Sequence, residues 1–180
     1  MYLIYYIQIN MTTNNDYSAL LSIHTDALTE APLKTLYTEK IVEMKQKHLT
    51  ATHIDSGFDL FVPTTITIPP GKIIIIDMNV RCAVYQGEQL KPSPYYLYPR
   101  SSVSKRGIIL ANSVGIIDSG YRGNLKAGFY NTNDEPITIK AGDRIVQICM
   151  PSLSTSYSYH LVQQLDETER GEGGLGSTGN

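Results

Sequence analysis

The chain has 180 residues, of which 42% are hydrophobic and 18% charged, and its formal net charge is −2. This length favours one domain with its own core, and the near-neutral charge argues against a dedicated nucleic-acid binder, which needs a surplus of Lys and Arg. Two cysteines are too few for a disulfide scaffold or a four-ligand zinc site, so Cys82 and Cys149 are expected to be buried, reduced thiols.

The first segment, residues 1–17, is interpreted as a flexible leader. Its apolar stretch, residues 1–9, is about half of the roughly 20 residues that a membrane span needs. It also has no basic region and no small-residue cleavage site, which are the marks of a signal peptide. The sequence therefore predicts no membrane partner and an intracellular protein, either cytoplasmic or nuclear.

Residues 18–53 hold the helical signal of the chain. Leu36, Ile41 and Met44 form an apolar stripe between Lys, Glu and Gln residues, and Thr35 or Thr38 is a candidate cap. We expect this short helical segment to precede a single β domain, which together with it spans 18–165.

From Asp55 to about Gln164 the pattern is typical of β-structure. Alternating or β-branched runs at 66–68, 73–76, 80–85, 137–139 and 145–150 are separated by turn signals such as Pro69-Pro70-Gly71 and Ala141-Gly142-Asp143. Because crossover helices are missing between these runs, a barrel or sandwich is favoured over a parallel α/β fold. The last segment, 166–180, is a glycine-rich arm that should be mobile unless a ligand or another segment holds it.

Five clusters with chemical potential follow one another along the β region and the arm. They are Ser56-Gly57-Phe58-Asp59-Leu60, then 99–107 (PRSSVSKRG), 112–123 (NSVGIIDSGYRG), 142–148 (GDRIVQI) and 170–179 (RGEGGLGSTG). An Arg beside serine hydroxyls grips phosphate, and a glycine-rich loop with an Arg wraps an anion. Gln147 inside an apolar strand is costly to bury unless it hydrogen-bonds, so it is expected to face a site. Taken singly, each cluster also fits a plain turn, a hairpin or a linker.

Together and in this order, the clusters resemble the five motifs of the trimeric dUTPase (deoxyuridine 5′-triphosphate nucleotidohydrolase) family, from about Ser56 to Gly179. The resemblance implies an all-β, jelly-roll-like fold and a homotrimer whose sites are shared between subunits. It also implies hydrolysis of the substrate dUTP to dUMP and pyrophosphate with Mg²⁺ as cofactor. In this interpretation the arm closes over the bound nucleotide.

The resemblance also assigns roles to residues. Asp118 orients the attacking water and contacts the sugar 3′-hydroxyl, Gln147 helps to hold the water or an α-phosphate oxygen, and Asp59 is linked to the metal through water. The substrate-binding residues implied are Arg100, Ser101 and Ser102 for phosphate, Tyr121 under the deoxyribose, Asn112 with the backbone of Ile116, Ile117 and Lys126 for uracil, and Arg170, Leu175, Gly176, Ser177 and Thr178 of the arm. Arg100 and Arg170, with Mg²⁺, supply the charge neutralisation that phosphoryl chemistry needs, whereas Lys105, Arg106 and Arg122 are expected to be surface charges.

One residue departs from the family pattern, because Leu175 stands where the family carries a Phe expected to stack on uracil. Base–aromatic stacking is worth roughly 1–3 kcal/mol per base, so the resemblance predicts weaker closure of the arm in this chain.

Three alternatives remain at this point. A dCTP deaminase resembles the same fold, but Gly128 stands where that family carries its Glu base. A jelly-roll binding or structural module gives no reason for Arg100, Asp118, Gln147 and Arg170 to converge. A regulator without turnover conflicts with the otherwise complete catalytic set. The helical segment is expected to pack on the outer surface of the trimer or to cap the barrel, unless it binds an extra partner.

Overall fold

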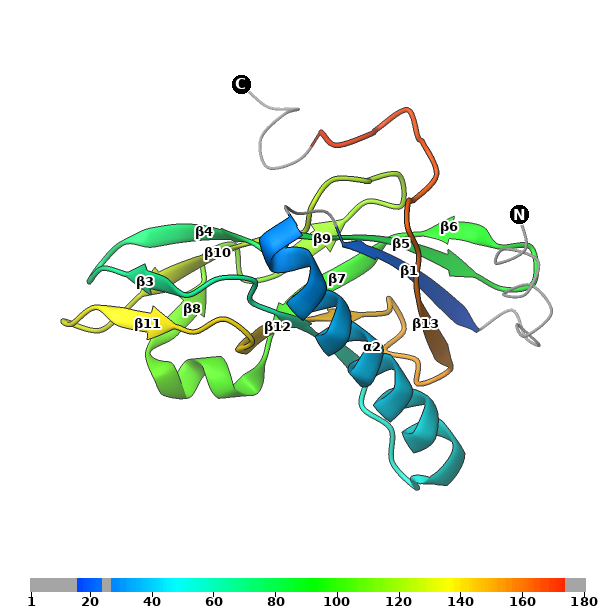
Figure 1. Ribbon diagram of the computed structural model, residues 1–180, viewed down its shortest axis with the longest axis horizontal. Helices are drawn as coiled ribbons and strands as arrows, with labels where there is room; N and C mark the ends of the chain where they lie inside the picture. Colours follow the sequence, from blue (N-terminus) through cyan, green and yellow to red (C-terminus); the bar gives the residue numbers. More distant parts are fainter. Residues whose placement is uncertain (1–15, 24–26, 174–180) are drawn as a thin grey trace.

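The computed structural model describes residues 16–23 and 27–173, in which most of the ordered backbone is β-strand (Figure 1). The elements in chain order are β1 (Tyr17–Ile23), α2 (Ala27–Thr50), β2 (Gly57–Phe61), β3 (Ile66–Ile68), β4 (Ile73–Asp77), β5 (Val80–Gln86), β6 (Lys91–Ser93), β7 (Tyr95–Pro99), the 3₁₀-helix η1 (Ser101–Arg106), β8 (Ile108–Leu110), β9 (Gly115–Ile117), β10 (Lys126–Asn131), β11 (Ile137–Ile139), β12 (Arg144–Cys149) and β13 (Tyr157–Leu161).

These strands form four small sheets around a large apolar core, beside a second, smaller cluster of Leu20, Ala83 and Leu165. Their orders are β13-β1-β5-β6, β2-β12-β7-β9, β4-β10-β8 and β11-β3. The described pairings are antiparallel except for β1 with β13, which run parallel. The prediction of an all-β, jelly-roll-like fold with a helical segment near the N-terminus is confirmed.

Helix α2 is the long helix of the described chain, and it crosses the strands and packs on β13 and β1 (Figure 1). It buries Leu33, Tyr37, Ile41 and Met44, which recur three or four positions apart and so share one face. Tyr37 is fully buried, and its hydroxyl accepts a hydrogen bond from the backbone N–H of Phe61 in β2. The helix is therefore anchored directly to the strand that carries the first sequence cluster.

Strand β1 differs from the sequence-based expectation, which placed its residues in the leader and the helical segment. It lies between β13 and β5, and six of its seven residues are buried. Tyr17, Ala19 and Leu21 pack into the large core while Leu20 packs into the smaller cluster, so both faces are buried and burial does not alternate along the strand. Periodicity does not separate such a strand from a buried helix.

Both cysteines are free and buried, which confirms the sequence-based prediction. Burial raises the pKa of the Cys82 thiol to about 12 and that of Cys149 to about 11, so neither thiol provides a nucleophilic thiolate at neutral pH. Within residues 16–23 and 27–173, no helix combines the length and apolar character that crossing a bilayer requires.

Candidate active site

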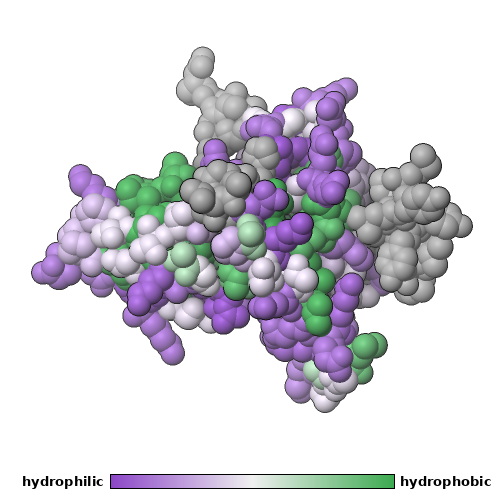
Figure 2. Space-filling view, viewed as in Figure 1, coloured by the Kyte–Doolittle hydropathy of each residue, from purple (hydrophilic) through white to green (hydrophobic). Residues whose placement is uncertain are grey.

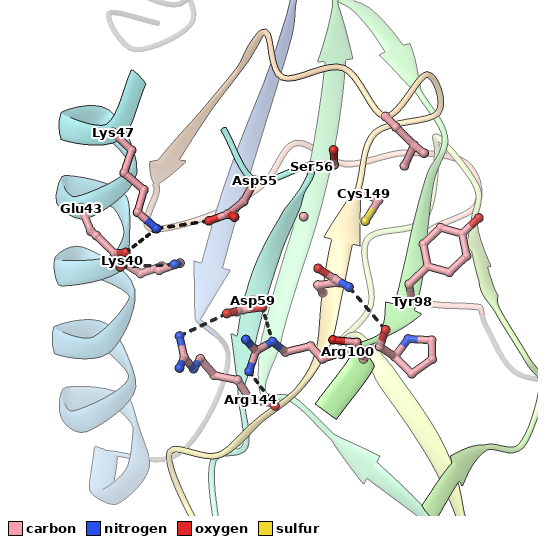
Figure 3. Close-up of a pocket in the computed structure, with 15 residues that line it drawn as sticks. Lys40, Glu43, Lys47, Asp55, Ser56, Asp59, Tyr98, Arg100, Arg144 and Cys149 are labelled. Atoms are coloured by element: carbon pink, nitrogen blue, oxygen red, sulfur yellow. Dashed lines mark hydrogen bonds and ion pairs between the residues drawn. The ribbon is translucent and has the colours of Figure 1, made fainter. Parts of the chain in front are cut away.

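A polar pocket of about 660 Å³ opens on one face of the sheet that contains β2, β12 and β7 (Figure 3). In the register of this sheet, Gln147 of β12 lies between Asp59 of β2 and Tyr98 of β7. Arg100 and Ser101 follow directly after β7, where the chain turns into η1, and they line the same pocket. Four of the residues predicted from the sequence thus meet here, although they come from three separate clusters.

Asp59 is the electrostatic centre of this pocket. Its Oδ1 lies 2.8 Å from Nε of Arg100, and its Oδ2 lies 3.2 Å from Nη1 of Arg144, while the side chain is only 10% exposed. A carboxylate this buried needs cationic partners, and the two guanidinium groups are held at the pocket wall in return. Arg144 was missed in the sequence analysis, although its position in the Gly142-Asp143-Arg144 turn before Gln147 was a usable signal.

Gln147 has a fixed orientation for a local reason. Its Nε2 donates a hydrogen bond to the carbonyl of Pro99 at 3.3 Å, and its Oε1 lies directly over Gly57, where any Cβ would overlap the amide group. Gly57 is therefore required by close approach. Ser102 lies beside Ser101 in η1 and is exposed.

A second, smaller pocket of about 130 Å³ gathers most of the predicted nucleoside-binding set. It is lined by Asn112, Gly115, Ile116, Ile117, Asp118, Tyr121, Lys126 and Arg170. Strand β9 contributes Gly115, Ile116 and Ile117 to the lining and lies at the edge of its sheet, so within residues 16–23 and 27–173 no strand pairs with its outer side. This side of the strand is available for hydrogen bonds to a ligand.

Two residues give this pocket its chemical character. Asp118 is 58% exposed and pairs with Arg170, whose Nη2 lies 3.1 Å from its Oδ2. The Tyr121 hydroxyl donates to the carbonyl of Asn124 at 2.8 Å, which holds the ring at the pocket wall. Burial, with a smaller contribution from the Asp77 carboxylate, raises the pKa of Tyr121, so the phenol stays neutral.

The first part of the arm is docked onto the domain in the described residues. The Thr168 hydroxyl donates to the carbonyl of Gly120, Arg81 pairs with Glu172 at 2.7 Å, and the backbone N–H of Arg122 donates to the carbonyl of Gly171 at 2.8 Å. These contacts bring Arg170 to Asp118. Leu175, Gly176, Ser177 and Thr178 lie outside the described residues.

Arg122 was expected to be a surface charge, and that expectation is wrong. Its side chain is 6% exposed, and its Nε lies 3.1 Å from Oδ1 of Asp166. Nη1 also donates to the carbonyls of Ser119 and Tyr121 at 2.9 and 3.0 Å. Arg122 therefore ties the Asp118–Tyr121 turn to the base of the arm, 44 residues later in the chain.

The two pockets lie on either side of β7. Gln147 and Asp59 line the larger pocket, and Asp118 and Arg170 line the smaller one. Strand β7 pairs with β12 through Gln147↔Tyr98 and with β9 through Tyr96↔Ile116. Because residues two apart in a strand share a face, Gln147 and Ile116 project from the same face of this sheet.

Comparison with known proteins agrees with the sequence motifs. The family model for dUTPase matches residues 45–179. The deoxyuridine 5′-triphosphate nucleotidohydrolase of Shewanella baltica (strain OS155) is 36% identical over 132 residues, which are 72% of this chain and 84% of that protein. The protein of the same name from Escherichia phage T5 is 36% identical over 115 residues, covering 63% of this chain and 73% of its own.

Two solved dUTPase structures are also similar to this chain. A dUTPase from Streptococcus mutans is 32% identical, with a TM-score of 0.46 over 56% of this chain and 78% of that one. A Staphylococcus bacteriophage 80alpha dUTPase mutant with dUpNHpp is 23% identical, with a TM-score of 0.46 over 73% of this chain and 89% of that one. On the strength of the family model and the sequence relatives, this chain belongs to the dUTPase family.

Proposed function

We propose that this dUTPase family member hydrolyses dUTP to dUMP and pyrophosphate by attack of water on the α-phosphate. The water oxygen bonds to the α-phosphorus while the bond from that phosphorus to the oxygen bridging to the β-phosphate breaks. Asp118 orients the water and accepts its proton. The observation that carries the proposal is the meeting of Asp118, Tyr121, Asn112 and Arg170 in one small pocket.

The small pocket offers groups that suit the nucleoside end of the substrate. The free edge of β9 presents the backbone of Ile116 and Ile117. Strand β10 pairs with β8 only from Phe129 to Asn131, so the backbone of Lys126, at the start of β10, is not covered by β8. With the Asn112 side chain, these groups would read the donor–acceptor edge of uracil. A cytosine edge would leave buried polar groups unpaired, which disfavours dCTP. The Tyr121 ring would pack under the deoxyribose and exclude a 2′-hydroxyl.

The large pocket fits the phosphates. Arg100 offers a planar guanidinium group and Ser101 a hydroxyl, with the Ser102 hydroxyl next to it, and Gln147 offers an amide held by Pro99. A triphosphate carries about four negative charges, and hydrolysis depends mainly on positioning and charge neutralisation. Arg170, with the rest of the arm, would add a further cation when it closes over the nucleotide.

Mg²⁺ fits as a cofactor that the nucleotide brings with it. In the described parts of the chain, no group of three or more His, Cys, Asp or Glu side chains is arranged to hold a metal alone. Mg²⁺ needs few protein ligands, because it retains waters and binds phosphate oxygens. Both Asp59 oxygens are paired with Arg100 and Arg144, so a link from Asp59 to the ion would run through water. When bound, Mg²⁺ neutralises phosphate charge and polarises the α-phosphate.

We further propose a homotrimer in which each site takes residues from different subunits. Within one chain, the phosphate-binding and nucleoside-binding residues line separate pockets. A surface for association exists on the β4-β10-β8 sheet, where Ile73, Tyr130 and Ile109 lie side by side in register and Ile73, Ile75 and Ile109 are exposed. Figure 2 shows apolar side chains gathered over β4. Exposed apolar patches of this kind mark interaction surfaces.

The activity is tested by pyrophosphate release from dUTP, dCTP, dTTP and UTP with Mg²⁺, for the parent and for Asp118→Asn. We expect turnover of dUTP alone and a loss of at least about a hundredfold in the variant. An Asp118→Asn protein as fast as the parent would show that another group activates the water. Release of ammonia from dCTP would assign the chain to deamination instead.

Sharing of sites has a separate test. Arg100→Met and Asp118→Asn are each expected to be inactive alone. Co-expressed subunits that mix at random would restore about a quarter of the sites, because a site that takes these residues from two chains can then receive both unchanged. Failure to restore activity in verified hybrid trimers would place both residues of a site in one chain, and a monomer that hydrolyses dUTP would exclude the trimeric arrangement.

A further inference from the structure

Helix α2 forms one wall of the phosphate pocket. Lys40, Glu43 and Lys47 project from one side of the helix toward the strands that carry Asp59 and Arg100 (Figure 3). The dUTPase family model begins to match at residue 45, so Lys40 and Glu43 lie outside it. Both residues also lie outside the five sequence clusters that carry the resemblance to the family, although they line the same pocket as Asp59, Arg100 and Gln147.

Lys40 is unusually buried for a lysine. Its side chain is only 8% exposed, and its Nζ lies 3.2 Å from Oε2 of Glu43, whose own side chain is 48% exposed. Lysines are almost never this buried without a partner, and an ammonium group has three protons to donate. In the described part of the chain Glu43 is the one carboxylate paired with Lys40, which leaves Lys40 with donor capacity inside the pocket that it lines.

Glu43 does not depend on Lys40 for a cation. Its Oε1 lies 2.9 Å from Nζ of Lys47, and the hydrogen bond from Lys47 is the main cause that lowers the pKa of Glu43, with Lys40 contributing less. Lys47 in turn also pairs with Asp55 at 3.2 Å. Lys47 is therefore held between two carboxylates. Lys40 can instead leave Glu43 and bind an anion, because Glu43 keeps its contact with Lys47.

The charges that line the pocket favour an anion. Four cations face three carboxylates: Lys40, Lys47, Arg100 and Arg144 against Glu43, Asp55 and Asp59. We propose that Lys40 is a further substrate-binding residue, whose ammonium group contacts the phosphates of the nucleotide from the α2 wall. The inference rests on the proposed function, because it takes this pocket to be the phosphate half of the dUTP site. A desolvated lysine is a strong point charge for phosphate, and its attraction is screened little by salt.

The test compares Lys40→Met with Lys45→Met. Lys45 is exposed on the same helix and is not among the residues that line the pocket, so it controls for charge and for helix propensity. Methionine keeps the apolar length of the lysine stem. For Lys40→Met we expect KM for dUTP and the inhibition constant of pyrophosphate to rise by about tenfold, while inhibition by deoxyuridine, which has no phosphate, stays unchanged. Lys45→Met should match the parent in all three measurements.

Glu43→Gln is a second variant, for which we expect pyrophosphate inhibition to change in the opposite direction. Removal of this carboxylate frees Lys40 and lowers the negative charge of the pocket, so pyrophosphate should inhibit more strongly. If Lys40 has only a structural role, both variants shift pyrophosphate and deoxyuridine inhibition together, or neither, and the proposal is overturned. Lys40→Gln repeats the first test if Lys40→Met does not fold.

The outcome separates this inference from the proposed function. A parent that hydrolyses dUTP, with unchanged pyrophosphate inhibition in Lys40→Met, refutes the role of Lys40 and leaves the activity intact. A parent without dUTP hydrolysis refutes the proposed function, and calorimetric titration of tripolyphosphate into the parent and Lys40→Met then tests the anion contact by itself.

Discussion

The buried guanidinium group of Arg122 is the most informative residue to remove, because it joins the catalytic turn to the arm. In Arg122→Met the apolar volume is largely kept while three hydrogen-bonding partners, Asp166, Ser119 and Tyr121, are released. The Asp166 side chain is 48% exposed, so water can hydrate its carboxylate once the guanidinium group is removed. The ion pair therefore contributes about 1 kcal/mol to the free energy of unfolding. Each carbonyl that loses a charged donor costs about 1 kcal/mol. We expect the free energy of unfolding to fall by about 3 kcal/mol.

The assay is urea denaturation of both proteins at one protein concentration, because the stability of an oligomer depends on concentration. A double-mutant cycle with Asp166→Asn isolates the ion pair, which should couple by about 1 kcal/mol at pH 7. Burial alone would raise the pKa of Asp166, but hydrogen bonds from Arg122 and Tyr85 outweigh it and lower the pKa. This contribution is therefore present above the ordinary aspartate value and is lost as the pH falls through the lowered one.

Activity gives the second readout of the same change. Arg122 fixes the carbonyls on either side of Gly120, so the Asp118 carboxylate should lose its alignment and kcat should fall. A loss of stability below about 1 kcal/mol together with an unchanged kcat would refute the view that Arg122 holds the turn.

Three further predictions concern separate parts of the molecule. In Gly57→Ala the new methyl group displaces the Gln147 amide, so kcat should fall by roughly tenfold to a hundredfold while thermal unfolding shifts little; an unchanged kcat would contradict the assigned role of Gln147. Burial, with a smaller effect of the Lys45 charge, lowers the pKa of His160 to about 4, so the folded state binds this proton less readily than the unfolded state, and stability present above pH 6.5 should decline toward pH 4 by up to about 2 kcal/mol. Urea denaturation of His160→Gln across that range should show a flatter profile, and an equally steep one would assign the decline to other groups. Leu175→Phe should raise kcat/KM for dUTP severalfold through stacking on uracil; equal kinetics in the two proteins would remove this idea.

The strands with a clear pattern were predictable because their side chains face two different environments. The alternation at 137–139 and the turn at Gly142 place β11 and β12 within one residue of their observed bounds. Strand β1 was not predictable in this way, because β13 and β5 cover both of its edges and its run Tyr17–Ile23 is buried on both faces. Tertiary contacts, and not local propensity, decide its conformation.

The site residues were identifiable by type, but their partners were not. A sequence indicates that Asp59, Arg100 and Gln147 have chemistry to offer, because each is polar in a run that is otherwise strand-like or hydroxyl-rich. It does not reveal that Arg144 shares Asp59 with Arg100, since that triangle depends on the register of β2, β12 and the chain after β7. Long-range ion pairs of this kind arise only when the sheet has formed.

Helix α2 was predictable as a helix, but its position on the strands was not. The period of its apolar residues predicts a helix, and the burial of Tyr37 against β2 explains why that helix lies where it does. Since one turn separates Tyr37 from Ile41, any packing that buries both also carries Lys40, their neighbour, to the edge of the buried face. The apolar anchor thus fixes where Lys40 lines the pocket that also contains Asp59 and Arg100. Substitutions that move Tyr37 and Ile41 along the strands should therefore weaken phosphate binding even where the residues of the five sequence clusters are unchanged.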